Sequence, residues 1–132
     1  MTRYVIDAPT LLHLADGELT VATHHQLVAP VAIRSEALEQ LLHDVRLGTR
    51  TEQQARQLHT RMTEVKLRAL GDRVSRWTAS KIAREQDWDT LRDAEYLDVT
   101  RLQADALVTV DPRLAAVAAG IVAVQPVENL FE

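Results

Sequence analysis

The sequence predicts an α/β protein, a three-layer α/β/α sandwich in which helices cover both faces of a mainly parallel central sheet. Two observations lead to this prediction. Short apolar runs rich in β-branched residues alternate along the chain with longer segments whose apolar residues recur at helical spacing. The chain also has 132 residues, of which 46% are hydrophobic and 26% charged, and this fits a single globular domain spanning 1–132.

The first half of the chain opens with a short apolar run, "YVI", which is typical of a strand. Later in this half, Thr51 and Gln54 have the spacing of a capping box and Gly48 suits a helix end. The expected elements are a strand at 4–6, a helix between Pro9 and Gly17, a strand at 25–29, a helix at 31–47 and a polar helix from Thr51 to about Thr63.

The second half repeats the alternation of strands and helices. Gly71-Asp72 is expected to break the chain after an alternating segment, and Pro112 suits the first turn of a helix. The expected elements are a half-exposed strand at 65–70, helices at 73–86 and 91–103, a strand at 106–110, a helix from Pro112 to Gly120 and a strand at 121–124.

Composition excludes several classes of protein. The chain has no cysteine, which rules out disulfides and thiolate metal sites. Neither a membrane span nor a signal peptide is visible in the hydropathy pattern, so the expected location is cytoplasmic. The net charge of −4 speaks against a protein that grips nucleic acid mainly by neutralising phosphates. It leaves room for a nuclease whose carboxylates bind cations.

Two of the predicted strands run into an aspartate, "YVID" at Asp7 and "LVTVD" at Asp111. In open α/β sheets, ligands bind at the carboxyl ends of the strands, where both side chains are expected. Taken singly, each aspartate is more simply explained as the start of a turn or a helix cap. Two of them in one small domain favour a ligand site.

Two further acids, Glu36 and Asp93, lie at the edges of predicted buried helix stripes. Each alone fits a solvated flank or a first-turn acid that suits the helix dipole. Together with the two strand-end aspartates they form a set of oxygen ligands suited to Mg²⁺ or Mn²⁺. The chain has no P-loop, dinucleotide fingerprint or nucleophile elbow, so hydrolysis by metal-activated water is the chemistry we expect.

Four segments carry a resemblance to a known family: "YVIDAPTLL", "LVAPVAIRSEALEQLL", "DTLRDAEYL" and "ALVTVDPRLAAVA". In this order they resemble the PIN domain of VapC-type toxins, the toxic halves of bacterial type II toxin–antitoxin pairs. The resemblance covers nearly the whole chain, and "DAEYL" and "LVTVD" are its most specific parts.

The resemblance implies a PIN-like fold and an Mg²⁺- or Mn²⁺-dependent endoribonuclease that hydrolyses RNA, often structured RNA such as tRNA. Its catalytic and metal-binding residues correspond to Asp7, Glu36, Asp93 and Asp111, and Thr109 corresponds to a hydroxyl that supports the metal site. It also implies a homodimer and a cognate antitoxin as partners. Three leucines are candidates for the apolar contact surface: Leu11, Leu12 and Leu14.

The sequence departs from the family at one position. The family usually has Ser or Asn two residues after the first aspartate, whereas this chain has Pro9, which offers neither a side-chain hydrogen bond nor a backbone N–H. Thr10 is the candidate to take over that role. The departure and the negative net charge leave open an alternative, a catalytically inactive PIN-like module that binds RNA or protein. A phosphorylatable receiver domain fits less well, because the chain lacks its acidic pair and late lysine.

Overall fold

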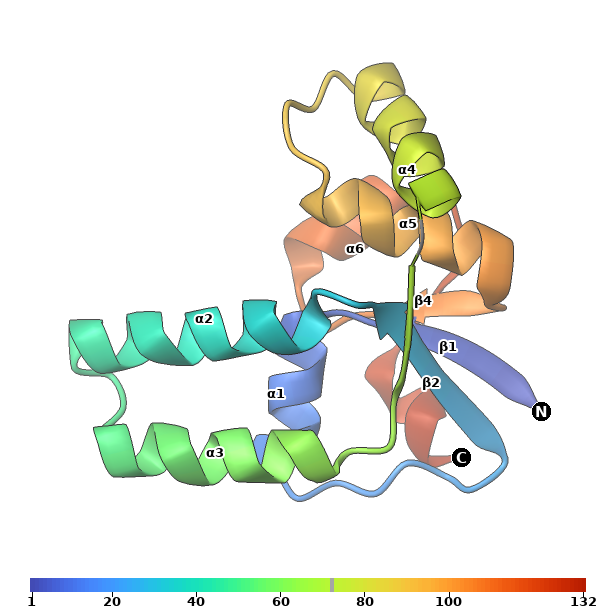
Figure 1. Ribbon diagram of the computed structural model, residues 1–132. Helices are drawn as coiled ribbons and strands as arrows, with labels where there is room; N and C mark the ends of the chain where they lie inside the picture. The colour runs from blue at the N-terminus through green and yellow to red at the C-terminus, as the bar shows by residue number, and fades with distance from the viewer. Residues whose placement is uncertain (72) are drawn as a thin grey trace.

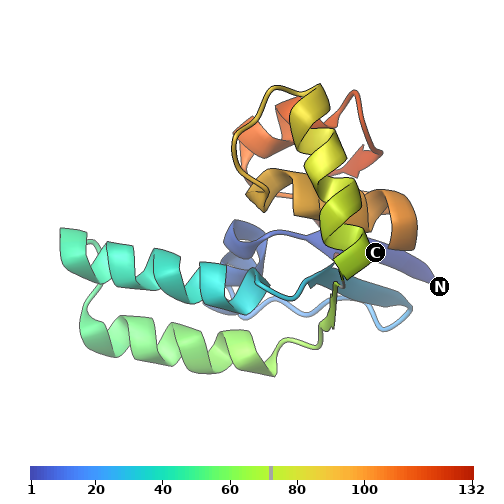
Figure 2. The same ribbon diagram turned by 45° about the horizontal axis from the view of Figure 1, so that its top comes forward.

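The computed structural model describes residues 1–71 and 73–132, with side chains undescribed at 73–75; Asp72, half of the predicted break, lies outside the described residues. It confirms the predicted α/β class. A five-stranded, all-parallel sheet carries helices on both faces (Figure 1). Figures 1 and 2 show α4, α5 and α6 on one face and α1 and α3 on the other.

The strands are β1 (Thr2–Ile6), β2 (His25–Pro30), β3 (Arg68–Leu70), β4 (Ala106–Val108) and β5 (Val124–Gln125). The helices are α1 (Ala8–Asp16), α2 (Ile33–Leu47), α3 (Glu52–Glu64), α4 (Arg73–Glu85), α5 (Arg92–Gln103) and α6 (Pro112–Ala118), and the 3-10 helix η1 (Val127–Phe131) follows. Every expected helix is therefore present, in the expected order.

Local sequence signals set the ends of several helices. Gly48 ends α2 with a φ of 80°, a left-handed conformation that glycine adopts without steric cost. Thr51 and Gln54 form the predicted capping box at the start of α3, with each side chain bonded to the backbone N–H of the other. Because these contacts are local, the connection between α2 and α3 could be predicted from the sequence.

The predicted strand at 65–70 is shorter than expected. Val65 ends α3 in place of starting a strand, and the pairing with β2 begins only at Arg68. The predicted strand at 121–124 likewise begins only at Val124, because the N–H groups of Ile121 and Val122 both bond back to the carbonyl of Ala118. In both places the preceding helix holds residues that the apolar pattern assigned to a strand.

The order of the strands in the sheet is β3-β2-β1-β4-β5. The chain adds β2 and β3 on one side of β1 and then returns to add β4 and β5 on the other side. The boundary between β1 and β4 is thus the place where the connections leave to opposite faces of the sheet. Such a switch point opens a crevice at the carboxyl ends of the two strands, and ligands bind there in open α/β sheets.

The core forms where the central strands meet the helices. Nearly all side chains of β4 and of the carboxyl halves of β1 and β2 are buried apolar groups, and α5 packs over all three strands. The three leucines expected at a contact surface are buried in this core, so that expectation was wrong: Leu11 (0% exposed), Leu12 (4%) and Leu14 (1%). Their helix packs against α2 and α3, which needs apolar groups on that side. Within the described residues, no helix has the length and apolar character of a membrane span.

Candidate active site

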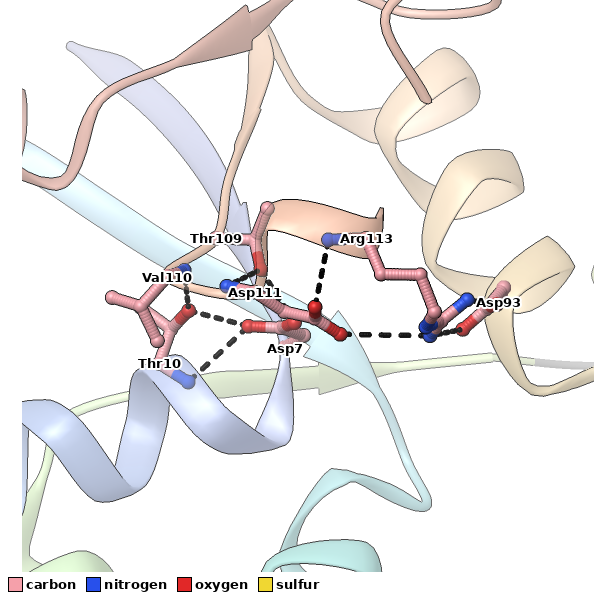
Figure 3. A network of polar contacts seen from close by, with 7 residues as sticks. All are labelled: Asp7, Thr10, Asp93, Thr109, Val110, Asp111 and Arg113. Atoms are coloured by element: carbon pink, nitrogen blue, oxygen red, sulfur yellow. Dashed lines mark hydrogen bonds and ion pairs between the residues drawn. The ribbon is translucent and has the colours of Figure 1, made fainter. Parts of the chain in front are cut away.

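Asp7 lies directly after β1 and begins α1 as its N-cap. The side chain is 4% exposed, so its carboxylate depends on protein hydrogen bonds in place of water. Oδ1 accepts from the backbone N–H of Thr10 at 3.2 Å and from the Thr10 hydroxyl, and Oδ2 accepts from the Thr109 hydroxyl at 2.6 Å (Figure 3). Both carboxylate oxygens are therefore fixed in direction.

The two threonine hydroxyls also hold the end of β4. The Thr10 hydroxyl accepts from the N–H of Val110 at 3.0 Å, and the Thr109 hydroxyl accepts from the N–H of Asp111 at 2.9 Å. These bonds replace the pairing that a longer strand would make. They explain why β4 stops at Val108 rather than running to 110 as expected, so that Asp111 follows a short turn and not the strand itself.

Thr10 makes the polar contact with Asp7 that Pro9 cannot make. Its hydroxyl and backbone N–H both donate to Asp7, while Pro9 occupies the first turn of α1, where an N–H is not needed. Thr109 stands where the resemblance placed a supporting hydroxyl, and the structure gives it a direct bond to Asp7. The first aspartate is thus held by hydroxyl groups despite the proline.

Burial raises the pKa of Asp7 above its ordinary value of 3.8, because the apolar surroundings disfavour the charged form. The hydrogen bonds from Thr10 and Thr109 act in the opposite direction and lower the pKa, but burial has the larger effect. The charged form of this carboxyl group is therefore poorly solvated inside the protein. A nearby cation would stabilise that charged form.

Glu36 lies in the first turn of α2 and its side chain is 15% exposed. Oε2 accepts from the hydroxyl of Tyr96, on α5, at 2.5 Å, and the guanidinium of Arg92 lies 3.7 Å from Oε1. Burial raises the pKa of Glu36, and the bond from Tyr96 partly offsets this. Burial also raises the pKa of Tyr96, and the contact with Glu36 adds to this rise, so the phenol remains a hydrogen-bond donor.

Removing the phenol hydroxyl with Tyr96→Phe is expected to raise the pKa of Glu36 further, because the bond that favours its charged form is lost. The measurement is a pH titration of the Glu36 carboxyl carbon by NMR in wild type and variant. Tyr4→Phe is the matched control, since Tyr4 is the chain's other tyrosine and is also buried. An unchanged or lower titration midpoint in Tyr96→Phe would contradict the assigned role.

Asp93 and Asp111 are connected by a single arginine. Nη1 and Nη2 of Arg113 bind the two oxygens of Asp93 at 2.8 and 3.3 Å, and Nη2 lies 3.5 Å from Oδ2 of Asp111 (Figure 3). Asp111 also caps α6, because its Oδ1 accepts from the N–H of Arg113 at 2.9 Å. The bond to Asp93 is the main reason that the pKa of Arg113 is raised.

All four acids predicted from the sequence line one cavity of about 400 Å³. They reach it from four segments of the chain, and each stands at a helix N-terminus: two as caps of α1 and α6, two in the first turns of α2 and α5. The positive ends of four helix dipoles offset part of the repulsion among the carboxylates. Sequence reasoning missed three residues of the same cavity wall: Arg92, Tyr96 and Arg113. Of these three, only Tyr96 could have been found from the sequence, because its spacing of three residues from Asp93 places both on one helix face.

The donor set fits a hard divalent cation, since it consists of carboxylate oxygens. The guanidinium between Asp93 and Asp111 shows in addition that this position attracts positive charge. In the arrangement seen here, no three His, Cys, Asp or Glu side chains among the described residues are grouped closely enough to hold one metal ion. Arg113 occupies the space between two of the acids, and Tyr96 binds a third.

Comparison with known proteins supports the fold. The structure is similar to the crystal structure of PAE2754 from Pyrobaculum aerophilum, with a TM-score of 0.70 and 26% sequence identity, over 98% of this chain and 93% of that chain. No model of a known protein family matches the sequence, and a comparison with curated proteins finds no match either.

Proposed function

We propose that this protein is a metal-dependent endoribonuclease that hydrolyses RNA phosphodiester bonds at the cavity lined by Asp7, Glu36, Asp93 and Asp111. One observation carries the proposal: four acids chosen from the sequence, 104 positions apart from first to last, line the same cavity at the switch point of a parallel sheet. A bound Mg²⁺ or Mn²⁺ would activate a water molecule and stabilise negative charge on the phosphate.

The protein's own residues prepare the site for that chemistry. Thr10 and Thr109 fix both oxygens of Asp7, so the direction of this carboxylate is set before any ligand binds. The Tyr96 hydroxyl orients Glu36 in the same way. Asp111 is held by the backbone of α6 through its capping bond. Asp7, Glu36 and Asp111 are thus positioned by bonds that leave further lone pairs for a cation. Asp93 differs, because both of its oxygens bind the Arg113 guanidinium.

The biological role that the sequence resemblance supports is that of the toxin in a type II toxin–antitoxin pair. Its expected substrate is a structured RNA such as tRNA, and its expected partners are a cognate antitoxin and a second copy of the chain. Induced expression in a bacterial host tests this part. Growth arrest that depends on Asp7 supports a toxin, whereas normal growth at a confirmed protein level would contradict it.

The cleavage proposal is tested with purified protein and a mixed tRNA pool, with Mn²⁺ or with EDTA. We expect fragments only with the metal. Glu36→Gln is expected to slow cleavage at least about a hundredfold, because it removes a charged ligand from the buried wall. Glu52→Gln is the control of equal charge change, since Glu52 is an exposed glutamate on α3 outside this cavity, and the rate of this variant should stay within about threefold of wild type.

Equal rates in the two glutamate variants would show that the charge at Glu36 has no special role, and the four-acid site would then be wrong. Cleavage in EDTA as fast as in Mn²⁺ would contradict the metal requirement.

A second candidate is a catalytically inactive module that binds RNA or protein. The ion pairs of Arg92 and Arg113 favour it, because they neutralise the acids without any metal. This candidate predicts RNA binding without fragments under every metal condition. Gel analysis of the RNA after incubation with Mn²⁺ separates the two.

A further inference from the structure

Arg113 stands at the centre of the proposed site, although it is not one of the acids. It lies in the first turn of α6, two residues after Asp111, and its guanidinium forms a two-pronged ion pair with Asp93 on α5. The same group reaches Asp111 at 3.5 Å. One positive charge is therefore shared by two of the four carboxylates.

The ion pair between Arg113 and Asp93 lies where its two charges can separate. The Arg113 side chain is 61% exposed, so water can solvate its guanidinium when the pair separates. A divalent cation carries twice the charge in a smaller volume and competes strongly for the same oxygens. Asp111 would keep its place after the exchange, since its capping bond uses the backbone N–H of Arg113 and not the guanidinium.

We propose that Arg113 is a phosphate-positioning residue: its guanidinium stays on Asp93 and Asp111 until a divalent cation replaces it, and it then binds the phosphodiester of the RNA. The proposal rests on the cation site of the proposed function. A guanidinium presents the same planar pair of donors to a phosphate as to a carboxylate, so the contact with Asp93 has the geometry that phosphate binding requires.

Cation binding and phosphate binding are coupled by this exchange. Without a cation, the guanidinium of Arg113 binds Asp93 and Asp111 and partly neutralises them. It is then not available to the phosphate of an RNA. With a cation the guanidinium is free at the rim of the cavity. Each ligand must therefore strengthen the binding of the other, since coupling between two sites is reciprocal.

The first test measures Mn²⁺ alone, by calorimetric titration of the metal-free protein. Arg113→Gln is expected to bind Mn²⁺ roughly fivefold more tightly than wild type, because the competing internal charge is gone. Arg101→Gln is the control of equal charge change. Arg101 lies in the last turn of α5, about 12 Å along the helix from Asp93. The Mn²⁺ affinity of Arg101→Gln should therefore stay within about twofold of wild type. Unchanged or weaker Mn²⁺ binding by Arg113→Gln would overturn the proposal; a variant that had merely lost structure would not bind more tightly.

The second test measures the anisotropy of a labelled single-stranded DNA of about ten nucleotides, a phosphodiester probe whose integrity is checked on a gel. Wild type should bind it more tightly with Mn²⁺ than with EDTA, and Arg113→Gln should lose most of that gain. Arg113→Lys should recover part of it, since lysine keeps the charge but not the fork. An equal gain in Arg113→Gln and wild type would refute the exchange. Neither test uses cleavage, so both results can hold even if the protein cuts no RNA.

Discussion

Replacing Asp7 with asparagine is expected to reduce RNA cleavage by about a thousandfold or more and, in the same protein, to increase stability at neutral pH. The loss of activity follows from the removal of the most buried ligand of the proposed cation site. The gain in stability follows from removing a desolvated charge. Asparagine has a similar shape and caps helices as well as aspartate does, and its amide can donate to the Thr109 hydroxyl that now donates to Asp7.

The effect on stability depends on pH in a definite direction. Because burial raises the pKa of Asp7, the folded chain holds the proton more tightly than the unfolded chain. The stability contributed by the protonated group is therefore fully present below the ordinary pKa of 3.8 and is lost as the pH rises through the raised pKa of the folded protein. Asp7→Asn avoids that loss. We expect the variant to exceed wild type at pH 7 by on the order of 1 kcal/mol, about 3–5 °C in Tm, and the difference to vanish in acid.

Thermal unfolding in EDTA across a range of pH measures this difference without interference from bound metal. Asp16→Asn is the matched control, because Asp16 lies in the same helix and is largely exposed, so that neither activity nor stability should change by much. If Asp7→Asn were less stable than wild type at pH 7, the desolvated carboxylate would not be the dominant feature of this position. If it kept its activity, Asp7 would not be a ligand.

The second large effect is expected from Thr10→Val, which removes one hydroxyl and keeps the shape of the side chain. Thr10 is completely buried, and its hydroxyl both donates to Asp7 and accepts from the N–H of Val110. Loss of these bonds leaves a buried carboxylate oxygen and a backbone N–H short of partners, which costs about 2–3 kcal/mol. It also removes a bond that lowers the pKa of Asp7, so that pKa should rise further.

Two measurements follow the Thr10 variant. Urea denaturation should show the loss of stability, and the acid limb of the cleavage rate should move to higher pH, because more alkaline conditions are needed to ionise Asp7. Thr10→Ser keeps the hydroxyl and should resemble wild type in the pH profile. If the acid limb lay at the same pH in Thr10→Val and Thr10→Ser, the Thr10 hydroxyl would not influence the pKa of Asp7. The role of Thr10 would then be structural only.

The alternation of strand and helix patterns was sufficient to predict the fold class, because period and composition are local properties of the chain. The same applies to the capping box at Thr51 and the left-handed end at Gly48, which depend on residues within one turn. The ends of the strands were less predictable. The end of β4 depends on Thr10, about a hundred positions away, whose hydroxyl takes the N–H of Val110 out of the sheet.

The acids show the same division. Asp7 could be found from the strand pattern, since it directly follows an apolar strand at the edge of a parallel sheet. Asp111 was found from the same pattern, although β4 ends at Val108 and a short turn carries this aspartate to the edge. Glu36 could not be separated from Glu39 by pattern alone, because both lie on one helix three residues apart. The tertiary structure separates them: the side chain of Glu36 is 15% exposed against Tyr96, and that of Glu39 is 71% exposed.

The layers, the order of the elements, Asp7 and Asp111 could be predicted from the pattern of the sequence, and the family resemblance added Glu36 and Asp93 to the acids that line the cavity. The surroundings of those acids became visible only in the folded protein: two threonines contact Asp7, a tyrosine contacts Glu36, and Arg113 lies between Asp93 and Asp111. These contacts join segments that lie up to 102 positions apart. Propensity and periodicity describe only neighbours along the chain, so partners that meet through the packing of α5 and α6 over the sheet become visible only in the folded protein.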